Sequence, residues 1–151
     1  MKLKVVVDTN IIFSAILKPD SRIGKIIITS KKHFQFYTCD YLKVELLKHR
    51  NKLLKLTMLL PEHLDELEFL LTKNIIFINE NLIPEKIIIE SENILREVDL
   101  NDTAFVALAK HMKARLWTGD KRLISGIEEK EFIETLTTNQ LSELLDRQER
   151  R

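Results

Sequence analysis

Four acidic side chains lie where the fold could bring their carboxylates together at one edge of a sheet. Asp8 directly follows the apolar run 3–7, and Asp120 follows the segment 114–119. Asp102 opens a predicted helix, and Glu45 lies within an amphipathic one. Carboxylate oxygens are the ligands that Mg²⁺ and Mn²⁺ prefer. If the four converge, they form a divalent-metal site suited to phosphate chemistry, because such a metal activates water and neutralises charge on phosphate oxygens.

Each acid also has an ordinary structural interpretation. The three aspartates precede helices, where aspartate is a common cap. Glu45 has Lys48 and His49 at the spacing of a helix-surface ion pair, which is worth about 0.2–0.5 kcal/mol. The joint pattern favours a metal site, because ligands of open parallel sheets bind outside the carboxyl ends of the strands, where the strand order reverses. Acids gathered there would repel one another without a cation.

Neighbouring residues bear on the same site. Asp99 precedes Asp102 by one helical turn, so it could be an additional ligand, a helix cap or the third acid itself. We favour Asp102 because an alanine-rich helix follows it directly. Thr9, Asn10 and Thr118 offer neutral oxygens that could orient the metal ligands.

The alternation of strands and helices predicts how these groups are positioned. Continuous β-branched runs such as 3–7 suit strands that are covered on both faces, as in a parallel sheet. We expect a three-layer α/β/α fold with a central, mainly parallel sheet of about five strands. One domain should span residues 1–145, and the charged tail 146–151 should fray. The predicted strands are 3–7, 34–37, 74–79, 114–117 and 132–136, and the predicted helices are 11–17, 22–30, 41–49, 61–71, 84–98, 102–111 and 139–148.

The composition excludes several classes of protein. The 151 residues are 44% hydrophobic and 31% charged, which suits one globular core. A net charge of +1 provides no long-range basic field for a polyanion, so any such contact would be local. The single cysteine, Cys39, allows neither an internal disulfide nor a cysteine-based zinc site. Since the sequence has no signal-peptide core and no run of roughly 18 apolar residues, we expect a cytoplasmic protein without a membrane partner.

Four motifs make the chain resemble the PIN-domain family. Their order and context match over nearly the whole chain, and the four together are fairly specific although any one is weak. The motifs are Val5-Val6-Val7-Asp8-Thr9-Asn10-Ile11-Ile12, Tyr41-Leu42-Lys43-Val44-Glu45-Leu46, Asp102-Thr103-Ala104-Phe105-Val106-Ala107-Leu108-Ala109 and Leu116-Trp117-Thr118-Gly119-Asp120-Lys121-Arg122-Leu123.

This resemblance implies a PIN-like fold and a metal-dependent endoribonuclease that uses Mg²⁺ or Mn²⁺. It maps the catalytic and metal-binding acids of the family onto Asp8, Glu45, Asp102 and Asp120. Many small relatives are VapC-like toxins of toxin–antitoxin pairs, so the implied partners are an RNA substrate, an antitoxin protein and a second copy of the chain.

Basic residues near the predicted site could contact RNA phosphates. Lys121 and Arg122 follow Asp120, while His49 and Arg50 belong to a second basic cluster. A solvated surface is the alternative interpretation of either cluster.

Two other functions remain open from the sequence. One is a PIN-like module that binds RNA or protein without turnover. The other is a phosphatase of the haloacid-dehalogenase type, which also places an aspartate at a strand end but usually requires a second aspartate two positions later, where this chain has Asn10.

Overall fold

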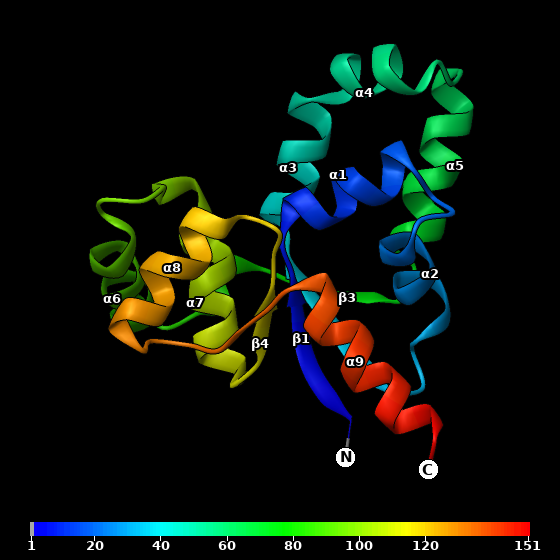
Figure 1. Cartoon of the computed structure of the whole chain (residues 1–151). Coiled ribbons are helices and arrows are strands. Elements are labelled where there is room, and N and C mark those ends of the chain that lie inside the picture. Colours follow the sequence, from blue (N-terminus) through cyan, green and yellow to red (C-terminus); the bar gives the residue numbers. More distant parts are fainter. Residues whose placement is uncertain (1) are drawn as a thin grey trace.

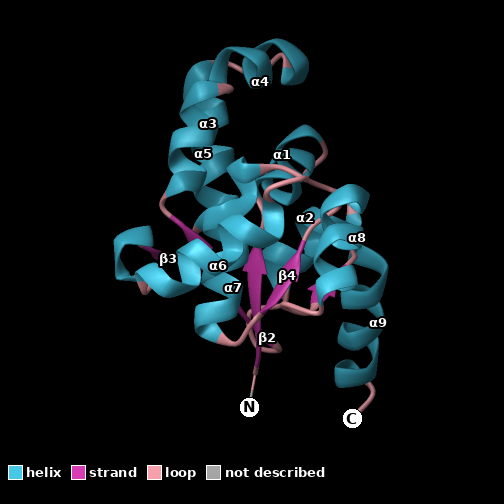
Figure 2. Ribbon diagram, turned by 90° about the vertical axis from the view of Figure 1, so that its left-hand side faces the viewer, coloured by secondary structure: helices cyan, strands magenta, loops and turns pink. Residues whose placement is uncertain are grey.

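The computed structural model describes residues 2–151, and its centre is a parallel β-sheet (Figures 1 and 2). Every strand pairing within these residues is parallel, and the order across the sheet is β3-β2-β1-β4-β5. The prediction of a five-stranded parallel sheet is therefore confirmed. The strands are β1 (Leu3–Val7), β2 (Phe34–Cys39), β3 (Ile75–Ile78), β4 (Arg115–Trp117) and β5 (Thr135–Leu136).

Helices cover both faces of the sheet. On one side α7 packs against β1, β2 and β4 and is itself covered by α6, while α8 contacts α6 and β5. On the other side lie α1, α2 and α9, and the segments α3 to α5 extend beyond the carboxyl ends of the strands (Figure 1). Within residues 2–151, no helix combines the length and apolarity that crossing a bilayer demands. The helices are α1 (Thr9–Leu17), α2 (Arg22–Thr29), α3 (Tyr41–Lys48), α4 (Arg50–Thr57), α5 (Pro61–Thr72), α6 (Glu85–Leu95), α7 (Thr103–Met112), α8 (Lys121–Lys130) and α9 (Thr138–Glu149), with short 3₁₀ turns η1 (Glu80–Leu82) and η2 (Leu100–Asp102).

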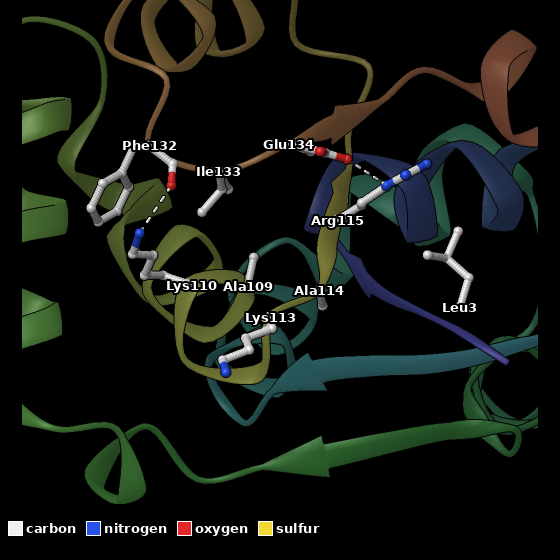
Figure 3. A pocket seen from close by; sticks show the side chains of 9 residues that line it. All are labelled: Leu3, Ala109, Lys110, Lys113, Ala114, Arg115, Phe132, Ile133 and Glu134. Atoms are coloured by element: carbon white, nitrogen blue, oxygen red, sulfur yellow. Dashed lines mark hydrogen bonds and ion pairs between the residues drawn. The ribbon is translucent and has the colours of Figure 1, made fainter. Parts of the chain in front are cut away.

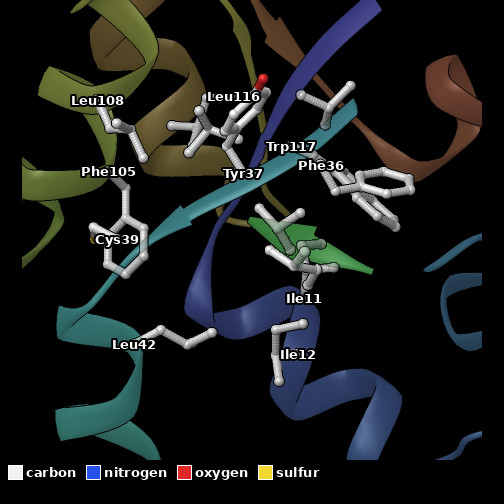
Figure 4. Close-up of a cluster of buried hydrophobic side chains, with 14 of the residues drawn as sticks. Ile11, Ile12, Phe36, Tyr37, Cys39, Leu42, Phe105, Leu108, Leu116 and Trp117 are labelled. Atoms are coloured by element: carbon white, nitrogen blue, oxygen red, sulfur yellow. The ribbon is translucent and has the colours of Figure 1, made fainter. Parts of the chain in front are cut away.

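Apolar side chains from both helical layers meet on the sheet. Val5, Val6 and Val7 of β1 are fully buried, as a strand covered on both faces requires. The aromatic rings of Phe36 and Trp117 lie against each other with centroids 6.1 Å apart (Figure 4). The indole Nε1 of Trp117 donates a hydrogen bond to the hydroxyl of Thr138 at 3.1 Å, which links β4 to the start of α9. Both rings are buried and belong to the hydrophobic core.

The structure differs from the predicted elements in a few places. Helix α4 was not expected, because Leu53 is its only buried residue and no apolar stripe marks it. Strand β5 begins at Thr135, since pairing with β4 starts only where the amide of Leu116 donates to the carbonyl of Glu134 at 3.0 Å. Helix α6 ends at Leu95, three residues before the predicted end. Helix α9 continues to Glu149, so most of the charged segment 146–151 is helical.

Candidate functional site

The order of the strands places the topological switch point of the sheet between β1 and β4. The chain builds outward from β1 to β2 and β3 on one side, then returns to add β4 and β5 on the other. In such sheets the helices that follow the two central strands diverge, which leaves space at their carboxyl ends for a ligand. The amide of Asp8 donates to the carbonyl of Trp117 at 3.1 Å, so the ends of β1 and β4 are joined at this point.

Asp8 lies at this switch point, and both of its carboxylate oxygens accept hydrogen bonds. Only 2% of the residue is exposed. Its Oδ1 accepts from the amide of Thr9 at 2.8 Å, and its Oδ2 accepts from the hydroxyl of Thr118 at 2.7 Å and from the side-chain amide of Asn10 at 3.2 Å. Burial raises the pKa of Asp8 from 3.8 to about 6; the hydrogen bonds from Thr118 and Thr9 oppose the rise, and the charges of Glu45 and Asp120 add to it.

Asn10 and Thr118 connect the two strand ends through their side chains. The Asn10 amide nitrogen also donates to the Thr118 hydroxyl at 3.1 Å, and its Oδ1 accepts from the amide of Gly119 at 3.2 Å. The amide of Asp120 donates to the same hydroxyl at 3.2 Å. The sequence predicted that Thr9, Asn10 and Thr118 would surround the acids, and the structure brings all three to Asp8 or to its neighbours.

Glu45 is held against the same site by Thr9. The hydroxyl of Thr9 donates to Glu45 Oε1 at 2.6 Å, which joins α3 to the first turn of α1. Within the described residues no ion pair links Glu45 to Lys48 or His49. The His49 ring instead packs edge-on against Phe13, with centroids 5.4 Å apart. The helix-surface interpretation of Glu45 is therefore wrong.

The remaining acids differ in what their carboxylates do. Asp120 caps α8, since its Oδ1 accepts from the amides of Arg122 and Leu123 at 3.0 and 3.1 Å. Asp99 is exposed and caps η2 by accepting from the amide of Asn101 at 2.9 Å.

Asp102 makes no capping hydrogen bond, although its helix α7 begins at the next residue. Burial raises the pKa of Asp102 from 3.8 to about 8, and the next largest cause is the negative charge of Asp8, followed by those of Asp99, Asp120 and Glu45. Asp102 is thus electrostatically part of the site without a local structural role for its carboxylate.

The chemistry of these donors fits a hard divalent cation, although their present positions do not form a coordination cluster. In the part of the chain that the structure describes, no three histidine, cysteine, aspartate or glutamate side chains are grouped as metal ligands. Asp8, Glu45 and Asp120 instead direct carboxylate oxygens at protein donors, as mutually repelling anions do. Burial and mutual repulsion raise the pKa values of Asp8 and Asp102, and Mg²⁺ or Mn²⁺, which prefer oxygen ligands, would offset this repulsion.

The basic residues predicted to contact RNA occupy different environments. Lys121 and Arg122 are exposed in the first turn of α8, beside Asp120, and Arg122 donates to the carbonyl of Glu97 at 3.2 Å. Arg50 lies beyond α3, where it binds Asp65 at 2.6 Å and the carbonyl of Pro61 at 3.3 Å.

A separate cavity of about 490 Å³ lies at the opposite end of the sheet (Figure 3). It is lined by the amino-terminal residues of β1 and β4, Leu3 and Arg115, together with Lys110 of α7 and the segment 132–134. Arg115 forms an ion pair with Glu134 at 2.7 Å. Because this cavity lies at the amino ends of the strands, it is not part of the acidic site.

Comparison with known proteins agrees with this architecture. The family model of the PIN domain matches residues 6–145. Among solved structures, the chain is similar to one in the crystal structure of VapBC2 from Rickettsia felis bound to a DNA fragment from its promoter. That match has a TM-score of 0.70 at 15% sequence identity and covers 89% of this chain and 98% of the other. No curated protein matches significantly. Since the family model spans nearly the whole chain, the protein belongs to the PIN-domain family.

Proposed function

We propose that this PIN-domain protein is an endoribonuclease that requires Mg²⁺ or Mn²⁺. The observation that carries the proposal is the position of Asp8, buried at the junction of β1 and β4 and coupled by charge to Asp102, Glu45 and Asp120. Clustered acids of this kind are costly unless they serve a cation. Family membership supports nuclease chemistry over the phosphatase alternative, and Asn10 bridges the strands where a phosphatase would need a second carboxyl.

The residues of the site would divide the work as follows. Asp8 and Asp102, whose pKa values are raised chiefly by burial, would hold the cation, and Asp120 would complete the set through the carboxylate oxygen that does not cap α8. A bound divalent ion supplies charge neutralisation at the phosphate and lowers the pKa of its water. Glu45, fixed by Thr9, would orient the attacking water or bind a second ion. Lys121 and Arg122 would contact the RNA backbone beside the site.

A cleavage assay on single-stranded RNA tests the function directly. The purified protein should cut the RNA internally in millimolar Mg²⁺ or Mn²⁺, and excess EDTA should stop the reaction. Fragments would be resolved on a denaturing gel, with a phosphomonoester substrate assayed in parallel. RNA binding without cleavage under any metal condition would instead favour a PIN-like binding module, and phosphomonoester hydrolysis alone would favour a phosphatase.

Thr118→Val should lower the rate of RNA cleavage by roughly 10- to 100-fold, the usual effect of losing a group that orients a metal ligand. The substitution keeps the shape of the side chain but removes the hydrogen bond to Asp8 Oδ2. Thr38→Val is the matched control, because its buried hydroxyl donates to the carbonyl of Val7 at 2.9 Å and contacts no acid. Both variants should melt at lower temperature, and only Thr118→Val should lose cleavage rate beyond that. Equal rates in the two variants would contradict an orienting role for Thr118.

We further propose that the protein is a toxin in the cytoplasm and that an antitoxin protein restrains it. It is supported by family membership and by the fold likeness to the VapBC2 chain. Large apolar side chains on α3 to α5, among them Leu47 and Phe69 at 75% and 70% exposed, would suit a protein partner. A homodimer remains a prediction.

A further inference from the structure

A second pocket is lined by residues that neighbour the site acids along the chain. Its volume is about 300 Å³, at the lower end of the range for ligand sites of roughly 300–1,000 Å³. Its walls flank site residues along the chain: Asn101 and Thr103 enclose Asp102 in sequence, and Tyr41 lies one helical turn before Glu45. A substrate whose phosphodiester reaches the acids therefore has its adjacent groups at this pocket. The lining is Tyr41, Glu80, Ile88, Leu100, Asn101, Thr103 and Ala104.

The lining is suited to a flat, uncharged group. One aromatic side chain and three aliphatic ones face the pocket together with an amide, a hydroxyl and a carboxylate. It contains no lysine, arginine or histidine, and Glu80 and the nearby acids would repel a phosphate. In an RNA chain the uncharged, flat component is the base, which proteins bind by stacking on aromatic rings and by hydrogen bonds to its polar edge.

Tyr41 and Glu80 are fixed relative to each other before any ligand binds. The backbone amide of Tyr41 donates to Glu80 Oε1 at 2.5 Å, which links the start of α3 to η1 across 39 positions of the sequence. The ring of Tyr41 packs at a tilt against the buried ring of Phe105, with centroids 6.3 Å apart. A preorganised aromatic wall loses little freedom when a ligand stacks on it.

We propose that this pocket receives a nucleobase next to the scissile phosphodiester, with Tyr41 as the stacking surface and Glu80 as the group that reads the polar edge of the base. The inference rests on the proposed ribonuclease function and adds a source of sequence preference to it. A carboxylate only accepts hydrogen bonds. Glu80 therefore favours bases that carry an exocyclic amino group, which are cytosine, adenine and guanine, over uracil, whose one N–H donor on that edge lies between two carbonyl oxygens that would repel the carboxylate.

The test compares RNA oligonucleotides that differ only in the nucleotide beside the cleaved bond. That nucleotide carries each of the four bases in turn, or it is abasic. In the wild-type protein, kcat/KM should be higher with an amino base than with an abasic position by roughly 5- to 150-fold, the range that base–aromatic stacking supports. Tyr41→Leu should bring this ratio close to one while keeping an apolar contact to Phe105. Glu80→Gln keeps an acceptor for the Tyr41 amide and should reduce the discrimination against uracil.

Phe69→Leu is the matched control, because it removes an aromatic ring that is 70% exposed and does not line the pocket. Its base-to-abasic ratio should equal that of the wild type. A wild-type ratio near one, or a Tyr41→Leu ratio equal to the wild-type ratio, would overturn the base pocket while leaving the ribonuclease proposal intact.

A binding measurement separates the two proposals if no RNA is cleaved. RNA that carries the fluorescent base 2-aminopurine should be quenched on binding to the wild-type protein and much less on binding to Tyr41→Leu. Quenching without cleavage supports the pocket and contradicts the ribonuclease. Equal fluorescence in both proteins, or no binding, would overturn the pocket as well.

Discussion

Asp8→Asn should reduce RNA cleavage by about 10³-fold or more while leaving the protein folded. The substitution removes one negative charge from a residue that is 2% exposed and lies at the centre of the acids. A divalent ion contributes several kcal/mol to such reactions, and about 4 kcal/mol corresponds to roughly 10³-fold in rate. Asparagine retains an oxygen that can accept from Thr9 or Thr118, so the strand ends stay joined.

The measurement is kcat/KM on single-stranded RNA with Mn²⁺, together with a thermal melt. Because burial opposes the charged form of Asp8, the neutral variant should melt no lower than the wild type at neutral pH. Asp146→Asn, at an exposed position of α9, is the control and should cleave normally. An Asp8→Asn protein that remains active and responds to metal would remove the basis for the site.

The stability of the metal-free protein should fall as the pH rises from about 4 to about 8. Asp8 and Asp102 have pKa values raised from 3.8 to about 6 and about 8, so in this interval the folded state binds more protons than the unfolded one. When the unfolded state binds fewer protons, the free energy of unfolding decreases with pH. This destabilisation is complete for Asp8 above about pH 6 and for Asp102 above about pH 8.

Asp102→Asn removes the larger of these effects. In EDTA at pH 8 it should raise the melting temperature by roughly 5 °C, since about 1–2 kcal/mol, after allowance for solvent screening of its exposed part, gives such a shift in a chain of this size. Asp146→Asn, at an exposed position of α9, removes a charge that does not contribute to the raised pKa of Asp8 or Asp102, and it should change the pH dependence of stability little. Mg²⁺ should raise the melting temperature of the wild type at pH 8 much more than that of Asp102→Asn. A melting temperature that rises with pH in EDTA would contradict the assigned repulsion.

Local sequence patterns predicted the parts of the fold that depend on local physics. The β-branched run 3–7 forms a strand because both of its faces are buried, and the apolar stripes of α1, α5 and α9 produce helices near the predicted bounds. Composition could not predict which strands would pair. The order across the sheet follows from contacts between residues far apart in the chain, which leave no periodic signal.

In the candidate site, too, the sequence predicted what depends on neighbouring residues and not what depends on long-range contacts. The turn after β1 identified Asp8 and its neighbours, because a polar cluster at a strand end is visible in the sequence. Spacing alone could not separate Asp99 from Asp102; the structure does so by using the Asp99 carboxylate as a cap. The contact between Tyr41 and Glu80 was missed, since it depends on η1 folding back onto the start of α3.

The pairing of β1 with β4 also determines when, during synthesis of the chain, the candidate site can be completed. Asp8 and Thr118 are 110 positions apart, and β4 enters the sheet only after β1, β2 and β3 have been made. The residues up to and including β4 therefore have to be synthesised before the two halves of the site can meet. Fragments that end before β4 would lack Thr118 and Asp120, and so would lack the proposed ribonuclease activity.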